Sequence, residues 1–274
     1  MTEPNADDRE LVDLLARVWD DVFALCDDLT DAEWHTMTEC PGWSVHDNVA
    51  HLIGIESTIL GIPTPDVELG DAPHVKNDLG RMNEQWVEHY RSFAGADVLA
   101  ELRTIADRRL ADLRALDADG FDADAWTPVG PGKVRDLIPF RIYDTWAHEQ
   151  DIRNALGRPD NLDSPVAAFC LRRAQRPLGA VVGKRVAPPE GTIVDFVVEG
   201  PNAFTHALAV TGGRAQPVDA PAAPTTRITT DTATFVRLVN GRVAPTDALA
   251  SGAVTITGDT ALGERVVHAL NTML

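Results

Sequence analysis

The sequence predicts an α+β protein made of two domains: a helical bundle in residues 1–160, and a small α+β domain with a connecting helix in residues 161–274. Three observations support this division. Apolar residues recur at helical spacing through the first half. After the Pro- and Gly-containing segment 187–191, the pattern changes to short runs that favour strands. Finally, 274 residues exceed the usual size of one small domain.

The first half contains three clear helical segments. Residues 7–29 repeat apolar side chains every three to four positions, which predicts an amphipathic helix. Ser44 is a good N-cap, with Asp47 three positions later, and the helix that follows is expected to reach residue 60. Residues 134–156 form the third segment, closed by Gly157 and a proline two positions later.

The segments between these helices are less regular. Residues 78–116 are predicted to be helical with a break near Gly95, and residues 126–132 to form a loop. Residues 61–77 are rich in Pro, Gly and Asp and are longer than an ordinary connection. We therefore interpret them as a lid or wall over a site. Residues 164–180 are expected to form one more helix.

The second half is predicted to alternate strands and helices. The strand-like runs are residues 192–199, 206–210, 226–230 and 253–257, and the helical ones are 231–238 and 261–270. Residues 216–225, rich in Pro and Ala, are expected to form an exposed loop.

Composition restricts the partners and the compartment. A formal net charge of −18 disfavours binding to nucleic acid, whose affinity for proteins depends on Lys and Arg. The acidic N-terminus resembles no signal peptide, and no run of about 18 apolar residues predicts a membrane span. Three widely spaced cysteines suit a reducing compartment. We therefore expect a cytoplasmic protein without a membrane partner, either a monomer or a homodimer.

Asp144 and His148 are the first candidate site residues. They are four positions apart in the predicted helix 134–156, so both side chains reach the same neighbourhood. Other histidines, among them His35 and His268, also have an acidic residue four positions away, so an intrahelical ion pair explains the spacing equally well. This helix is amphipathic, however, and an inward-facing carboxylate requires a partner.

His51, in the predicted helix before residue 60, could supply a third ligand from a second helix. Two imidazoles and one carboxylate leave an open coordination position, as in catalytic zinc sites. An ordinary half-buried histidine is the alternative interpretation of His51. Glu56, further along the same helix, could orient a ligand or could simply reach solvent.

Other residues were considered for supporting roles. Arg141 and Arg153 could pair with a substrate carboxylate or with neighbouring aspartates, and we favour a structural role for Arg153. Trp43 and Trp146 are expected to be core aromatics. Cys40 lacks a neighbouring base in the sequence, so we expect a small buried residue rather than a nucleophile.

Two sequence blocks resemble the mycothiol-dependent maleylpyruvate isomerase family of the DinB-like superfamily. They are WSVHDNVAHL at residues 43–52 and RIYDTWAHEQDIRNALG at residues 141–157. The closing VTITGD at residues 254–259, with Leu270 and Asn271, looks like that family's sterol-carrier-like C-terminal domain. The resemblance covers nearly the whole chain and implies a DinB-like four-helix bundle followed by a sterol-carrier-like domain.

The resemblance also implies a metal site and a reaction class. The family's ligands, a histidine on the second helix and a carboxylate and histidine four apart on the last bundle helix, match His51, Asp144 and His148. The family's carboxylate is often glutamate, whereas this chain has aspartate. The implied cofactors are Zn²⁺, or another divalent metal, and mycothiol, and Arg141 and Glu56 are candidate cofactor-binding residues.

The reaction implied is isomerisation of a small electrophile, in which a thiolate adds to a cis double bond and leaves after rotation. An S-transferase would stop after the addition. Two other functions remain open: a metal-containing binding protein without catalysis, and a metal-dependent hydrolase that uses water in place of the low-molecular-weight thiol.

Overall fold

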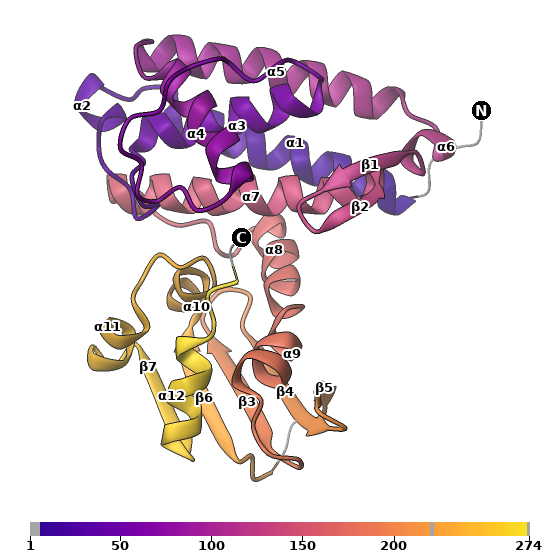
Figure 1. Ribbon diagram of the computed structural model, residues 1–274, viewed down its shortest axis with the longest axis vertical. Coiled ribbons are helices and arrows are strands. Elements are labelled where there is room, and N and C mark those ends of the chain that lie inside the picture. The colour runs from indigo at the N-terminus through magenta and orange to yellow at the C-terminus, as the bar shows by residue number, and fades with distance from the viewer. Residues whose placement is uncertain (1–5, 220–221, 273–274) are drawn as a thin grey trace. The chain divides into compact units, whose positions relative to one another are not determined.

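The computed structural model describes residues 6–219 and 222–272 (Figure 1). The chain separates into two compact units, Met1–Asp160 and Asn161–Leu274. The first is helical apart from one small hairpin, and the second combines helices with a five-stranded sheet. The α+β class is therefore confirmed, with the helical unit first in the chain.

Four long helices form the bundle of the first unit: α1 (Ala6–Cys26), α3 (Val45–Ile59), α5 (Gly95–Ala115) and α7 (Val134–Leu156). Helix α1 packs on α5 and α7, and α3 packs on the same two helices. A shorter helix, α4 (Asp78–Tyr90), lies against α3. This arrangement buries the apolar faces predicted from the sequence and brings α3 and α7, which carry the candidate ligands, into contact.

The start of α3 is determined by the predicted N-cap. The Ser44 hydroxyl accepts a hydrogen bond from the backbone N–H of Asp47, and the Asp47 carboxylate accepts one from the backbone N–H of Ser44. This reciprocal pair is a capping box, which satisfies donors that the first turn leaves free. Because α3 starts at Val45, His51 lies near the middle of the helix.

The predicted helix over residues 78–116 is two helices. Helix α4 ends at Tyr90 and α5 begins at Gly95, so the break expected near Gly95 is confirmed. A Cβ on Gly95 would lie 2.3 Å from the Trp34 ring, and only glycine allows this approach. The first helix of the bundle ends at Cys26, three residues before the predicted end at residue 29.

Several short elements in the first unit were not predicted. Residues Asp31–Trp34 and Ala118–Phe121 form the short helices α2 and α6. The predicted loop 126–132 is mostly an antiparallel hairpin, formed by β1 (Asp124–Thr127) and β2 (Gly130–Lys133). Its strands are only four residues each, too short to show a clear alternation in the sequence.

The prediction of one helix over residues 164–180 was wrong. Helix α8 (Pro165–Gln175) ends before Pro177, and α9 (Leu178–Ala180) and a turn of π-helix, η1 (Val181–Val186), follow. Proline has no backbone N–H to donate to the preceding turn and clashes with it, so it interrupts the helix.

A mixed five-stranded sheet organises the second unit. Its order is β5-β4-β3-β6-β7, with β3 and β6 parallel and the other neighbours antiparallel. Helix α12 packs on β6 and β7, while α9 and η1 pack on β5. The elements are β3 (Ile193–Glu199), β4 (Phe204–Thr211), β5 (Arg214–Val218), β6 (Thr226–Asp231), β7 (Val254–Gly258), α10 (Thr232–Val239), α11 (Pro245–Ala250) and α12 (Thr260–His268).

The predicted strands and two helices of this unit are confirmed, whereas β5 and α11 were not predicted. Part of the loop expected at residues 216–225 belongs to β5, the edge strand that contains Pro217. An edge position tolerates proline because one side of the strand needs no ladder donor. Residues 220–221 of that loop lie outside the described residues.

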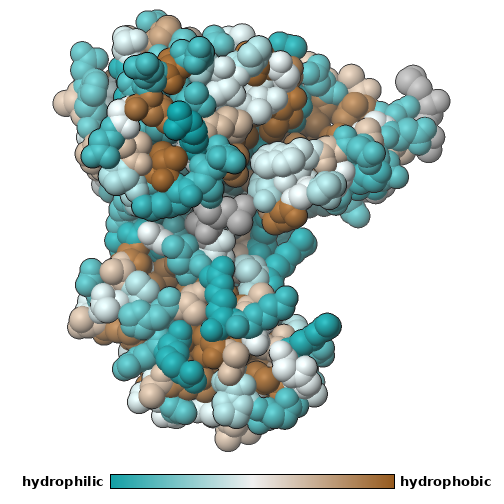
Figure 2. Space-filling view, in the orientation of Figure 1, coloured by the Kyte–Doolittle hydropathy of each residue, from teal (hydrophilic) through white to brown (hydrophobic). Residues whose placement is uncertain are grey.

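Over the described ranges, none of the helices combines the length and the apolar character needed to cross a membrane. On the face that Figure 2 shows, hydrophilic residues surround separate hydrophobic patches on both units.

Replacing Gly54 by alanine should destabilise the bundle. Gly54 lies in α3, and an added Cβ would be 2.5 Å from the Cβ of Trp86 on α4, an atom that no change of rotamer can move away. Overpacking of this kind costs about 1–3 kcal/mol, more than the gain of up to ~1 kcal/mol in helix propensity. Urea denaturation should show a lower free energy of unfolding. Gly70→Ala, with no atom within 4 Å of the added Cβ, is the control and should be neutral.

The three cysteines are buried thiols that form no disulfide within the described residues, and Cys26 should resist alkylation in the native protein. Burial, with the nearby charge of Glu149, raises the pKa of the Cys26 thiol to about 12. Since only the thiolate reacts, the native protein should show negligible iodoacetamide labelling of Cys26 at pH 9, and the unfolded protein rapid labelling. Peptide mapping by mass spectrometry measures both rates. Equal rates in the two states would contradict the buried environment.

Candidate metal centre

The structure brings the three predicted ligands together between α3 and α7. The Nε2 atom of His51 lies 3.2 Å from Oδ2 of Asp144, and Nε2 of His148 lies 3.8 Å from Oδ1 of the same carboxylate. The ligand atoms of these residues all lie within 4.8 Å of one another. Both histidine side chains are 4% exposed, but the Asp144 side chain is 24% exposed. The group is therefore buried on the histidine side and reaches solvent at Asp144.

Asn48 determines which nitrogen of His148 faces the group. The Asn48 amide N–H₂ donates to the Ser44 carbonyl at 2.7 Å and to the Thr38 hydroxyl at 3.1 Å, so its oxygen must be the atom 2.6 Å from Nδ1 of His148. Oδ2 of Asp151 lies 3.2 Å from the same Nδ1. Two acceptors place the proton on Nδ1 and leave the Nε2 lone pair directed toward Asp144.

A chain of buried charges holds Asp144. Arg141 donates from Nη1 to Asp144 Oδ2 at 2.9 Å and from Nε to Glu56 Oε1 at 2.7 Å. The second oxygen of Glu56 accepts from Nε of Arg109 on α5 at 3.0 Å. Glu56 is 0% exposed, so the alternative that it reaches solvent is wrong. It contacts no candidate ligand directly and orients Asp144 through Arg141.

The environment sets the protonation states that a metal requires. Burial alone would raise the pKa of Asp144, but the charge of Arg141 and then the contact with His51 outweigh it, and this pKa lies well below its usual range. Burial lowers the pKa of His51, an effect that exceeds the opposing influence of Asp144. Asp144 therefore offers a carboxylate and His51 a neutral imidazole at neutral pH, and His148 adds its Nε2 atom, so the residue types are those of many catalytic zinc sites.

His148 also belongs to a second group, with Cys40 and Asp151, whose ligand atoms lie equally close together. Asn48 and Asp151 already engage Nδ1 of His148, so Nε2 is the atom available to an ion, on the side of His51 and Asp144. Cys40 is 8% exposed, in agreement with its prediction as a small buried residue.

The other candidates have structural surroundings. Trp146 is fully buried, as predicted. Arg153 donates to Glu149 at 2.7 Å and to the Pro159 carbonyl at 2.8 Å, which agrees with the structural role although its partner is not Asp151. Trp43 is 7% exposed, and its ring centroid lies 4.8 Å from that of His51 and 5.7 Å from that of His148. It is a core aromatic that forms one wall of the candidate metal centre.

The sequence of the chain matches two known protein families. Residues 15–153 match the family described as the mycothiol maleylpyruvate isomerase N-terminal domain, a match that spans just over half of the chain and includes all three candidate ligands. The chain belongs to this family. Residues 176–271 match the SCP-2 sterol transfer family. No curated protein matches the chain.

Solved structures of the family share the fold. The crystal structure of the mycothiol-dependent maleylpyruvate isomerase aligns with a TM-score of 0.58 and 15% sequence identity, covering 91% of this chain and 92% of that one. A histidine-to-alanine mutant of the isomerase aligns with a TM-score of 0.55 and 14% identity over the same shares. Both likenesses extend through the bundle and the sterol-carrier-like domain.

Sequence reasoning identified Glu56 and Arg141 but missed two other residues that orient the ligands, Asn48 and Arg109. Asn48 lies three positions before His51 on the same face of α3, and this spacing was the available signal for it. Arg109 carried no such signal, because its contact with Glu56 joins positions 53 residues apart.

Removing the charge of Glu56 should destabilise the bundle strongly. Among the described residues, Glu56→Gln would remove the carboxylate that pairs with Arg109 and leave Arg141 with the partly exposed Asp144, and breaking a buried pair costs about 3–5 kcal/mol. Chemical denaturation would measure the loss. Glu88→Gln is the control, because Glu88 pairs with Arg91 at a site where both side chains are 37% exposed, and the loss there should stay below about 1 kcal/mol. Equal losses in the two variants would contradict the importance of the buried chain.

Proposed function

We propose that this protein is a metal-dependent enzyme that uses mycothiol and acts on a small electrophile as an isomerase or an S-transferase. The observation that carries the proposal is the group of His51, Asp144 and His148, buried on one side and open to solvent at Asp144. Membership of the maleylpyruvate isomerase family supports the choice of thiol.

His51, Asp144 and His148 would hold Zn²⁺ or another divalent ion. When bound, such an ion lowers the pKa of a coordinated thiol and supplies a thiolate nucleophile at neutral pH. The chain itself contributes the prepared donor set. Asn48 keeps the Nε2 lone pair of His148 free, and Arg141 keeps Asp144 ionised.

Arg141 has a donor left for the substrate. Its Nε and Nη1 groups are used by Glu56 and Asp144, whereas Nη2 is buried without a hydrogen-bond partner among the described residues. Once a substrate displaced the atoms that cover Nη2, this donor would bind a carboxylate oxygen of an acidic electrophile such as a 2-oxo acid. Glu56, which accepts from Nε of Arg141, would then hold the guanidinium in the orientation that this contact requires.

Calorimetric titration of mycothiol into the zinc-loaded protein tests the proposal. Two buffers of different ionisation enthalpy should reveal the release of about one proton per thiol bound, because coordination forms the thiolate. His148→Ala should abolish binding and proton release. His268→Ala is the matched control: His268 also follows an acidic residue by four positions on a helix but is exposed on α12, and this variant should bind as the wild type does.

The outcomes separate the candidate functions. Zinc-dependent binding with proton loss would justify a screen of electrophiles for isomerisation and for thioether formation. Full zinc occupancy without thiol binding would refute the thiol mechanism, and turnover without added thiol would identify a hydrolase instead.

A further inference from the structure

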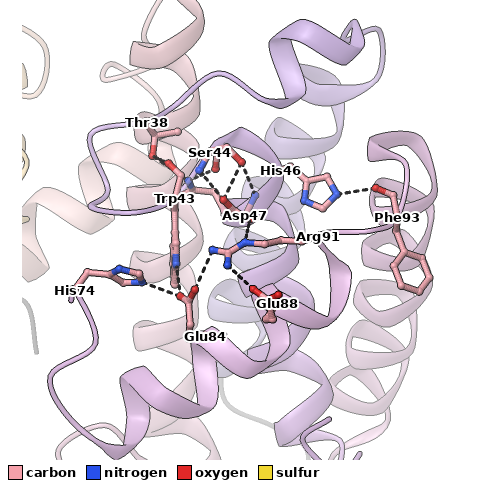
Figure 3. Close-up of polar contacts among 11 residues, drawn as sticks. Thr38, Trp43, Ser44, His46, Asp47, His74, Glu84, Glu88, Arg91 and Phe93 are labelled. Carbon is pink, nitrogen blue, oxygen red and sulfur yellow. Dashed lines mark hydrogen bonds and ion pairs between the residues drawn. The ribbon is translucent and has the colours of Figure 1, made fainter. Parts of the chain in front are cut away.

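A polar cluster behind the candidate metal centre holds Trp43 in place. The indole N–H of Trp43 donates to Oε2 of Glu84 on α4 at 2.9 Å (Figure 3). Glu84 is 2% exposed, and its partner is the ring that covers the imidazoles of His51 and His148. The buried Glu84 carboxylate is therefore hydrogen-bonded directly to Trp43, which forms one wall of the candidate metal centre.

Glu84 also ties three parts of the chain together. Its Oε2 atom lies 2.8 Å from Nε2 of His74 in the long loop 61–77, and its Oε1 accepts from Nη2 of Arg91 at 2.9 Å. Arg91 in turn donates from Nε to Asp47, the partner of Ser44 in the capping box of α3, at 3.2 Å. Glu84 thus joins the long loop to α4, and Arg91 extends the network from Glu84 to the start of α3 (Figure 3).

The loop is packed closely where it meets Trp43. A Cβ on Gly42 would lie 2.5 Å from Nδ1 of His74, and Gly42 has a φ of +82°. Only glycine accepts both the contact and the left-handed backbone. The His74 ring therefore packs against the residue before Trp43, while the role of the loop as a lid or wall over a site stays a prediction.

We infer that Glu84 is a positioning residue that holds Trp43 against His51 and His148 and thereby strengthens metal binding at the centre. This inference rests on the proposed function. Rotating the indole away would leave its buried N–H without an acceptor and would remove one donor from Oε2 of Glu84, and an unsatisfied buried donor is costly. In place, the ring excludes water from one side of both imidazoles and restricts their rotation, so the donors stay arranged for an ion.

Glu88 provides a matched comparison for Glu84. It lies one turn further along α4 and also pairs with Arg91, but none of its described contacts reaches Trp43 or His74. Glu84→Met and Glu88→Met each remove a carboxylate from Arg91, while only the first removes the acceptor of Trp43. Trp43→Phe provides the complementary change, because it keeps an aromatic ring and deletes the donor.

Zinc affinity, measured by competition with a chromophoric chelator, is the first readout. Glu84→Met and Trp43→Phe should each weaken zinc binding about tenfold, the lower end of the range for residues that orient metal ligands, and Glu88→Met less than about twofold. The double variant should bind no more weakly than either single variant, because both act through one hydrogen bond. Unchanged zinc affinity in Glu84→Met would overturn the inference. So would a fold-loss of zinc affinity in the double variant equal to the product of the losses in the two single variants.

A second readout works without any metal. The ring of Trp43 shifts the NMR resonances of nearby imidazole C–H groups, so Glu84→Met should move the signals of His51 and His148 in the metal-free protein, and Glu88→Met should not. Unmoved signals would refute the positioning role. If the wild-type protein binds no zinc, the proposed function fails, and this spectrum alone decides the role of Glu84. If Glu84→Met does not fold, the zinc affinity of Trp43→Phe tests the inference instead, and unchanged affinity in that variant would overturn it.

Discussion

The charge chain from Arg109 through Glu56 and Arg141 to Asp144 is the interaction on which the bundle depends. It joins α5, α3 and α7 in the interior, where two guanidinium groups face two carboxylates. Such a network is stable only when every charge has its counterpart. The network therefore favours one alignment of the three helices, in which His51 and His148 both lie beside Asp144.

The candidate ligands and the residues that orient them come from different sets of elements. The ligands come from α3 and α7, and their partners come both from these two helices and from segments packed against them. Asn48 is on α3 itself, while Glu84 reaches the centre from α4 through Trp43. Long-range contacts of this kind make the ligand geometry a property of the whole bundle, so substitutions well away from the ligands can alter it.

Local patterns predicted much of the fold. Regular apolar spacing predicted the four bundle helices, and the capping box at Ser44 predicted the start of α3 because both signals lie within a few residues. The hairpin β1–β2, strand β5 and the end of α8 at Gln175 escaped prediction, since short strands have weak periodicity and the apolar spacing continued past Pro177. For the candidate centre, spacing suggested Asp144 and His148, but pairing them with His51 across 93 positions required the family resemblance.

The burial of all three cysteines limits their reaction with small thiols and disulfides. Cys26, Cys40 and Cys170 are at most 8% exposed, so a disulfide form of a cellular thiol cannot reach them in the folded state. Thiol–disulfide exchange requires access of the attacking sulfur to its target. For the thiol-using enzyme proposed above, this burial would keep the protein's own cysteines from forming mixed disulfides with its ligand.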